Sequence, residues 1–258
     1  MIEFLKGLLF VRKCIFCGEV LTEKMDSVFC PKCRLEYEKL KRVPCRICGK
    51  KQTLCRCMPE NDGGLACSAV HLFEYDDELS RRILFLLKRK NLRVLQQFLS
   101  REIAFVISGV LGDDVSRYSI TFAPRAPKSI RVYGFDQAKR LCRGISGALG
   151  IPMIEIFRHR RYSEQQKRLN AEARGENARK SYELHHGFVQ KTKGLIIVDD
   201  VITTGSTVMT LSLLAREAGF SEILIATAAR TPYWKKEKRK DLSYASSEKK
   251  SEKQTDEL

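Results

Sequence analysis

The segment that most restricts the fold of this chain is LIIVDDVITTGST, residues 195–207. Four apolar residues precede Asp199 and Asp200, and a turn rich in Thr, Gly and Ser follows. A short apolar run bounded by Gly and Asp is typical of a central strand in a parallel sheet. Apolar residues then recur at helical spacing from Val208 to Ala218. The segment therefore predicts a strand, a loop and a helix, with the loop at the helix N-terminus.

This loop has the chemistry of a sugar-phosphate site. Ligands of open α/β sheets bind beyond the carboxyl ends of the strands, and a helix N-terminus attracts anions. The two carboxylates, Asp199 and Asp200, suit the vicinal hydroxyls of a ribose. A 5′-phosphate suits the residues of the turn, which are Thr203, Thr204, Gly205, Ser206 and Thr207. The alternative is a buried strand whose polar residues only cap the next helix, but capping uses one or two residues rather than seven.

The cysteines predict metal binding near the N-terminus. Nine of the ten lie before residue 68, and we expect no secretory signal, which disfavours disulfides. The first set, Cys14, Cys17, Cys30 and Cys33, has strong zinc-knuckle spacing. The second set, Cys45, Cys48, Cys55 and Cys57, ends in a less usual Cys-x-Cys, so Cys67 or His71 are alternative ligands. Free or bonded thiols, an iron–sulfur cluster and interleaved pairing remain alternatives.

We expect one or two structural zinc ions, because roughly 60 residues bury too little apolar surface to fold well alone. Four thiolates at each ion leave no open position for catalysis. Cys142 is expected to be a small buried side chain on a helix.

The chain is basic, with a formal net charge of +16. Single-stranded nucleic acid passing the ligand cleft would explain so many cations, whereas solvated helix faces are the simpler alternative. The cations form three clusters: Arg81, Arg82, Lys88, Arg89, Lys90 and Arg93; Arg125, Lys128, Arg131, Lys139, Arg140 and Arg143; and Arg158, Arg160, Arg161, Lys167 and Arg168.

The alternation of strand and helix patterns along the chain, together with its length, predicts an α/β fold with a parallel sheet flanked by helices. We expect helices over roughly 77–90 and 92–109, and strands near 119–123, 153–157, 195–199 and 222–228. The predicted organisation is a zinc-binding module over 1–62, an α/β domain over 63–232 and a disordered charged tail over 233–258. No apolar run approaches 18 residues, so we expect no membrane span. Residues 1–11 are predicted to form a short amphipathic helix on the zinc module, with membrane contact as the alternative.

Four motifs in order resemble those of a known family. LIIVDDVITTGST looks like the phosphoribosyl pyrophosphate motif of type I phosphoribosyltransferases. FAPRAPKSIRVYGFDQA, residues 122–138, resembles the P-x-P…R-x-x-G-F-N-Q-A segment of ComF proteins, and Gln166, Leu169, Arg174 and Asn177 fall on that family's spacing. The cysteine-rich N-terminus is the fourth motif, and the resemblance covers roughly residues 14–230. The chain departs at Asp136, where the family usually has Asn, and in the longer Pro124–Pro127 loop.

The resemblance implies a type I phosphoribosyltransferase-like domain that binds phosphoribosyl pyrophosphate with Mg²⁺. It places Asp199 and Asp200 at the ribose, residues 203–207 at the 5′-phosphate, and Arg125 with Lys128 at the pyrophosphate. Supporting roles in ligand or DNA binding fall on Lys88, Arg131, Gln137, Gln166 and Arg174, and residues 159–181 would form a flap over the ligand. Tyr133 and Tyr162 are candidates for base stacking.

The implied role is cytoplasmic handling of single-stranded DNA in natural transformation, beside a ComFA-like helicase or ATPase. Whether transferase chemistry occurs, and on which acceptor, stays open. Two alternatives remain: a nucleic-acid-binding protein that uses the phosphate site without turnover, and a nucleobase-salvage transferase.

Overall fold

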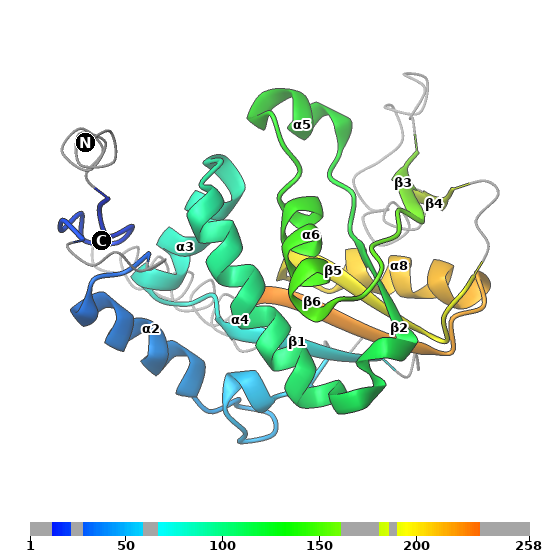
Figure 1. The fold of residues 1–258 in the computed structure, drawn as a ribbon, viewed down its shortest axis with the longest axis horizontal. Helices are drawn as coiled ribbons and strands as arrows, with labels where there is room; N and C mark the ends of the chain where they lie inside the picture. Colours follow the sequence, from blue (N-terminus) through cyan, green and yellow to red (C-terminus); the bar gives the residue numbers. More distant parts are fainter. Residues whose placement is uncertain (1–11, 22–27, 59–66, 161–180, 186–189, 233–258) are drawn as a thin grey trace, which may run out of the picture.

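The computed structural model describes residues 12–21, 28–58, 67–160, 181–185 and 190–232 (Figure 1). Several predictions lie outside these residues. They concern the N-terminal helix, the charged tail, and the residues Tyr162, Gln166, Leu169, Arg174 and Asn177.

A four-stranded parallel sheet forms the centre of the fold. Its strands are β1 (Cys67–Glu74), β2 (Tyr118–Phe122), β5 (Gly194–Ile202) and β6 (Glu222–Arg230), in the order β1-β6-β5-β2. Each neighbouring pair is parallel. The apolar run 195–198 lies in β5, between β6 and β2, so the prediction of a central parallel strand is confirmed.

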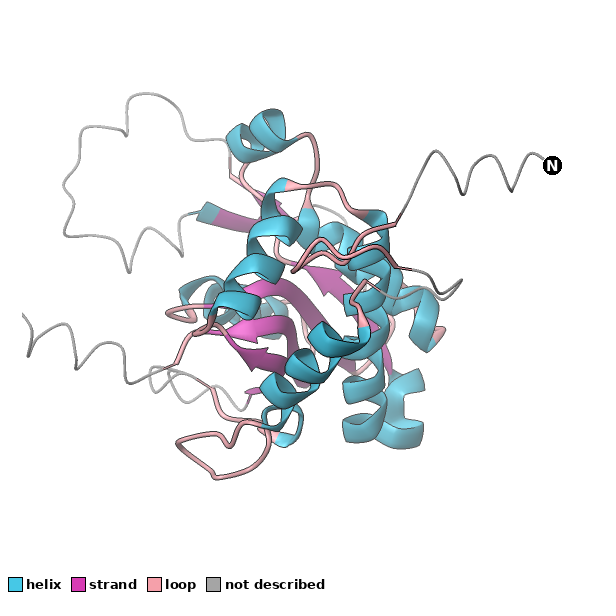
Figure 2. Ribbon diagram, turned by 90° about the vertical axis from the view of Figure 1, so that its left-hand side faces the viewer, coloured by secondary structure: helices cyan, strands magenta, loops and turns pink. Residues whose placement is uncertain are grey.

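Helices cover both faces of this sheet (Figure 2). Successive side chains of a strand point to opposite faces, and β5 divides accordingly: Ile196 and Val198 join one core cluster, Leu195 and Ile197 the other. The first cluster includes α3 (Glu78–Arg89), α4 (Arg93–Leu111) and α6 (Gln137–Leu149). The second includes α8 (Ser206–Glu217) and the antiparallel pair β3 (Phe157–His159) and β4 (Tyr182–Leu184).

The cysteine-rich region packs directly on this α/β body. Its elements are α2 (Pro31–Arg42) and the 3-10 turn η1 (Gln52–Leu54). Tyr37 of α2 is fully buried, with its ring 5.3 Å from Phe98 of α4 and 6.1 Å from Phe73 of β1. The first thiolate set and the sheet therefore share one hydrophobic core.

Three sequence-based element assignments need correction. Residues 153–157 form no strand of the main sheet: Met153 makes one isolated bridge to Ile120, and the chain then turns to pair β3 with β4. Edge strand β1 was not predicted at all. The loop after β2 contains a short helix, α5 (Pro127–Tyr133), before α6; a further 3-10 turn, η2 (Gly112–Arg117), joins α4 to β2.

One helical stretch, Arg93–Arg117, is long and apolar enough to cross a membrane by length and composition. Half of the 18-residue window that meets this criterion is buried inside the fold. The buried face includes Leu95, Leu99 and Ile103, which belong to the same cluster as β1 and α6. The apolar character of α4 thus follows from its place in the core.

Candidate functional site: carboxylates, phosphate loop and thiolate clusters

The predicted ribose residues lie at the carboxyl end of β5, where parallel-sheet proteins bind ligands. Asp200 is 5% exposed and accepts a hydrogen bond from Nε2 of Gln137, at 2.8 Å. Lys88 Nζ lies 3.7 Å from the same carboxylate oxygen, Oδ2. Gln137 Oε1 is buried, and no hydrogen-bond partner for it exists among the described residues. This oxygen and the carboxylates leave acceptors for a ligand's hydroxyl groups.

The Asp199 carboxyl is held in an unfavourable charged environment. Burial and the neighbouring Asp200 carboxylate raise its pKa well above the usual value, against the lowering effects of the Asp200 backbone N–H and of Lys88. Two carboxylates at the end of one strand favour a cation or hydroxyl donors at each of them. A sugar bound with Mg²⁺ supplies both the cation and the hydroxyl donors, so the two carboxylates fit such a ligand.

The phosphate loop presents hydroxyl groups at the N-terminus of α8. Gly205 adopts the left-handed conformation, with φ of 80°, as the residue before the helix. A side chain there would be strained, so glycine is required. Thr203, Thr204 and Ser206 are exposed, and the Thr204 and Ser206 hydroxyls lie 2.9 Å apart. This helix start therefore presents exposed hydroxyl groups of the kind that bind a phosphate.

Asp136 has a clear structural role, which the sequence had left in doubt. One carboxylate oxygen accepts from the Lys139 N–H at 3.0 Å and so caps α6; the other accepts from the Arg125 N–H at 2.8 Å. An asparagine has only one acceptor oxygen on its side chain. The carboxylate therefore joins the basic loop to the helix that carries Gln137.

Arg125, in the loop after β2, is held by the backbone of two neighbouring segments. Its Nη1 donates to the carbonyl oxygens of Lys88, at 3.4 Å, and Phe135, at 3.3 Å. The structure thus brings Lys88 and Gln137 to Asp200, and holds Arg125 against the backbone of Lys88. Lys128 and Arg131, predicted for the same loop, are exposed on α5.

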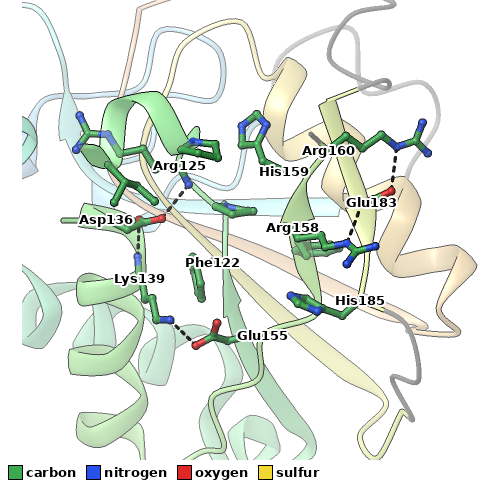
Figure 3. A pocket seen from close by; sticks show the side chains of 14 residues that line it. Phe122, Arg125, Asp136, Lys139, Glu155, Arg158, His159, Arg160, Glu183 and His185 are labelled. Carbon is green, nitrogen blue, oxygen red and sulfur yellow. Dashed lines mark hydrogen bonds and ion pairs between the residues drawn. The ribbon is translucent and has the colours of Figure 1, made fainter. Parts of the chain in front are cut away.

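A polar cavity of about 910 Å³ lies beside this centre (Figure 3). One wall is formed by Arg125, Asp136 and Lys139, and the opposite wall by residues of β3, β4 and the chain that follows. Arg158 and Arg160 are paired there with Glu183, at 2.8 Å and 3.4 Å, while His159 and His185 complete that wall. The lining therefore has four cationic and three acidic side chains, and Lys139 is paired with Glu155 at 2.6 Å, so most of its charges are already compensated.

Arginine and aromatic side chains alternate along one rim of the site. The Arg125 guanidinium lies 4.3 Å from the centre of the Tyr133 ring, and Arg89 lies 5.4 Å from that of Phe85. Arg89 also faces Tyr133, while Arg125 and Arg140 both face Phe135. We name this set the arginine–aromatic rim: Phe85, Arg89, Tyr133, Arg125, Phe135 and Arg140. Phe85 and Arg89 are exposed, so a further planar group can stack there.

Both predicted cysteine sets come together as clusters of four. Within each set, the four sulfur atoms lie within 4.8 Å of one another. The Cys17 and Cys30 sulfurs are 3.7 Å apart, as are those of Cys48 and Cys55. Four sulfurs about 2.3 Å from a central zinc ion lie about 3.8 Å from each other. Both sets therefore fit a tetrahedral metal.

The alternative ligands for the second cluster are not used. His71 Nε2 bonds Gln52 Oε1 at 2.8 Å, and burial with two nearby arginines lowers the His71 pKa to about 3. Cys67 begins β1 and belongs to neither described cluster. Cys142 is buried on α6, as expected.

Sequence reasoning missed one residue of the metal-binding region entirely. Arg230, the last residue of β6, is 2% exposed and donates from Nη2 to Cys45 Sγ at 3.0 Å and from Nη1 to Cys55 Sγ at 3.4 Å. Arg230 and backbone N–H groups, acting against burial, lower the pKa of Cys45 to about 6. No local motif marks an arginine 185 residues from its partner.

Comparison with known proteins gives two competence proteins. Competence protein F of Haemophilus influenzae is 34% identical over 102 residues, 38% of this chain, and the match spans only 43% of the relative's length. Competence protein ComFC of Streptococcus pneumoniae is 23% identical over 232 residues, 82% of this chain and 96% of the relative. No family model matches the chain.

Similar solved structures include a purine phosphoribosyltransferase from Pyrococcus horikoshii, with 21% identity and a TM-score of 0.31 over 53% of this chain and 75% of that one. A hypoxanthine phosphoribosyltransferase from Staphylococcus aureus has 11% identity and a TM-score of 0.34, over 53% and 65% of the two chains. The chain thus aligns with almost the whole of a ComFC protein and is similar to competence proteins of the ComF family, and its Asp-Asp and Thr/Gly/Ser motif lies at the end of a central strand in a parallel sheet flanked by helices.

Proposed function

We propose that this protein binds phosphoribosyl pyrophosphate with Mg²⁺ at the end of β5 and single-stranded DNA along the arginine–aromatic rim. The observation that carries the proposal is the carboxylate pair Asp199 and Asp200 beside the exposed hydroxyls of the α8 N-terminus. The carboxylates accept the ribose hydroxyls, and the backbone N–H groups and hydroxyls of residues 203–207 bind the 5′-phosphate.

The neighbouring side chains orient the diphosphate. Arg125, with Lys128 on the adjacent helix, balances the pyrophosphate, and Lys88 and Gln137 fix the Asp200 carboxylate. If C1′ loses pyrophosphate, the sugar ring gains positive charge, which the two nearby carboxylates stabilise. Mg²⁺ would neutralise the leaving diphosphate oxygens when bound.

The arginine–aromatic rim supports nucleic-acid binding. The exposed Phe85 ring and Arg89 guanidinium can stack on bases of any sequence, and exposed cations such as Lys90, directly after α3, and Arg131 on α5 attract the phosphate backbone. The rim includes Arg125, whose guanidinium also reaches the Lys88 carbonyl. A strand on this rim therefore passes the sugar-phosphate site.

We infer the wider role from the relatives' names. Both are called competence proteins, so we propose a cytoplasmic role in handling incoming DNA, beside a helicase-like ATPase. Zn²⁺ in the two thiolate clusters would stabilise the module over residues 1–62 and present it to that partner.

Calorimetry tests the sugar-phosphate site. Asp200→Ala removes the acceptor of the Gln137 bond and of a ribose hydroxyl, so we expect affinity for the Mg²⁺ complex of phosphoribosyl pyrophosphate to fall about 10- to 100-fold. Zinc content should stay at the wild-type value. Asp113→Ala, an exposed carboxylate on η2, is the control. Equal affinity in Asp200→Ala and wild type would refute the assignment.

Binding of a fluorescent single-stranded oligonucleotide tests the rim. Phe85→Ala should weaken binding by about 1–3 kcal/mol, because it removes a stacking surface. Phe105→Ala is the control, since Phe105 on α4 is 81% exposed. Affinity should also fall as salt rises. Equal losses at Phe85 and Phe105 would contradict a binding path along the rim.

A second candidate, a DNA-binding protein without turnover, is favoured by the same rim. In that case phosphoribosyl pyrophosphate competes with the oligonucleotide and no pyrophosphate is released. Release of pyrophosphate that depends on Asp199 and Asp200 would favour the transferase.

A further inference from the structure

Arg230 links the second thiolate cluster to the central sheet by three contacts of one buried guanidinium. Besides the two cysteine sulfurs at 3.0 Å and 3.4 Å, its Nη2 lies 2.9 Å from Glu74 Oε1 on β1. The Arg230 and Glu74 side chains are 2% and 11% exposed. Burial of an arginine is costly without anionic partners. This site therefore requires acceptors that are charged.

Metal-bound thiolates supply that charge. Four thiolates on one divalent ion have a formal charge of −2, whereas neutral thiols are weak acceptors. N–H donors to metal-bound ligands orient them and strengthen metal binding. Metal binding therefore gives the Arg230 guanidinium two thiolate acceptors, on Cys45 and Cys55, beside the Glu74 carboxylate.

The backbone of Arg230 is fixed at the same time to both neighbouring strands. It pairs with Glu74 of β1 and with Ile202 of β5. The Arg230 carbonyl accepts from the Tyr75 N–H at 2.7 Å, and Thr231 N–H donates to the Ile202 carbonyl at 2.8 Å. Ile202 directly precedes Thr203, the first residue of the phosphate loop.

We infer that Arg230 is a positioning residue through which metal occupancy of the second cluster controls the order of the loop after β5. The inference rests on metal binding at this cluster, which is part of the proposed function, but not on any sugar-phosphate ligand. Arg56 is a second cation beside the cluster, and it donates to the carbonyl oxygens of Thr53 and Cys55. It offers a matched control for local charge.

The test uses the zinc-loaded full chain as wild type, Arg230→Met, Arg230→Lys and Arg56→Met. A colorimetric chelator follows zinc release, while hydrogen–deuterium exchange follows peptides that cover residues 14–33, 45–57 and 194–207. We expect Arg230→Met to release one zinc at least about tenfold faster than wild type. Exchange should rise in the 45–57 and 194–207 peptides together, and the 14–33 peptide should keep its protection.

Arg230→Lys keeps a charge but loses the forked donor geometry, so its release rate should lie between the two. Arg56→Met should release zinc at nearly the wild-type rate. Wild-type release in Arg230→Met, or an equal acceleration in Arg56→Met, would overturn the inference. If Arg230→Met does not fold, wild type with one zinc removed provides the test: unchanged exchange at 194–207 while 45–57 opens would overturn it.

Discussion

Two anionic centres lie on the carboxyl side of the same sheet, and they differ in how their charge is balanced. The second thiolate cluster receives two N–H donors from a buried arginine. In the pair Asp199 and Asp200, Asp200 accepts one hydrogen bond from the Gln137 amide and has a lysine 3.7 Å away, Asp199 accepts one from the Asp200 backbone N–H, and the Asp199 pKa is raised well above its usual value. A centre balanced by the fold has a structural role, whereas a poorly balanced centre is ready for a ligand.

The largest effect on metal content and stability should come from a substitution in the second thiolate cluster, whose charge the fold balances. Cys45→Ser removes one metal ligand and one acceptor of Arg230, so we expect zinc to fall from two ions to one per chain. Unfolding stability should drop by several kcal/mol, because metal-binding energy stabilises a small module and a buried guanidinium loses its partner. Elemental analysis and thermal denaturation measure both.

Cys142→Ser is the control for this variant, since Cys142 is buried on α6 away from either cluster. It should keep both ions. Retention of two ions by Cys45→Ser would contradict the Cys45 assignment.

Asp199→Asn, in the carboxylate pair, should raise the stability of the protein, whereas Cys45→Ser lowers it. The folded-state pKa of Asp199 lies well above the ordinary value of 3.8. From about that pH upward, the folded state binds more protons than the unfolded state, so this group lowers stability as pH rises toward the folded pKa. Asn removes the penalty, and we expect a more stable protein at pH 7. Affinity for phosphoribosyl pyrophosphate should still fall by about 10- to 100-fold.

Urea denaturation at several pH values measures this effect as the difference between variant and wild type. Taking the difference removes the acid sensitivity of the thiolate clusters, which both proteins share. The difference in unfolding free energy should vanish near pH 4 and grow toward neutral pH. A variant that is less stable than wild type at pH 7 would show that the fold does balance this carboxylate.

Asp136 supplies a third carboxylate, one that is fully balanced by backbone donors. Asp136→Asn keeps the acceptor for one N–H but turns an amide donor toward the other, so we expect a loss of about 1 kcal/mol in unfolding free energy. Chemical denaturation measures the loss. Asp113→Asn, on an exposed carboxylate, should be neutral.

The sequence identified the unbalanced centre better than the balanced one. Residues 195–207 lie in one continuous segment, so strand, loop and helix could be inferred from their local pattern. Each cysteine set also lies within one short segment of the sequence. Arg230 could not be found, because its partnership with Cys45 depends on β1 and β6 pairing across the chain.

The same reason explains the errors in the strands. Edge strand β1 pairs with β6, more than 150 residues away, and its sequence CSAVHLFE has polar residues that suggested metal ligands. Residues 153–157 are apolar enough for a strand, but the backbone meets β2 only around Met153 before turning to β4. Long-range pairing decided both cases, and local periodicity does not report it.

The smallest expected change in stability comes from Lys88→Met, which tests directly how the carboxylate pair differs from the second thiolate cluster. Lys88 is the only cation within 4.0 Å of the Asp200 carboxylate among the described residues, yet its side chain is 40% exposed and the distance is 3.7 Å. Such a pair contributes little to stability, so Lys88→Met should alter unfolding free energy by less than about 0.5 kcal/mol. It should weaken binding of phosphoribosyl pyrophosphate, because a cation near the diphosphate is lost. Lys90→Met, an exposed lysine two residues away, is the control for both measurements. A large loss of stability in Lys88→Met would mean that the lysine balances Asp200 as Arg230 balances the thiolates, and the two centres would then differ in ligand type alone.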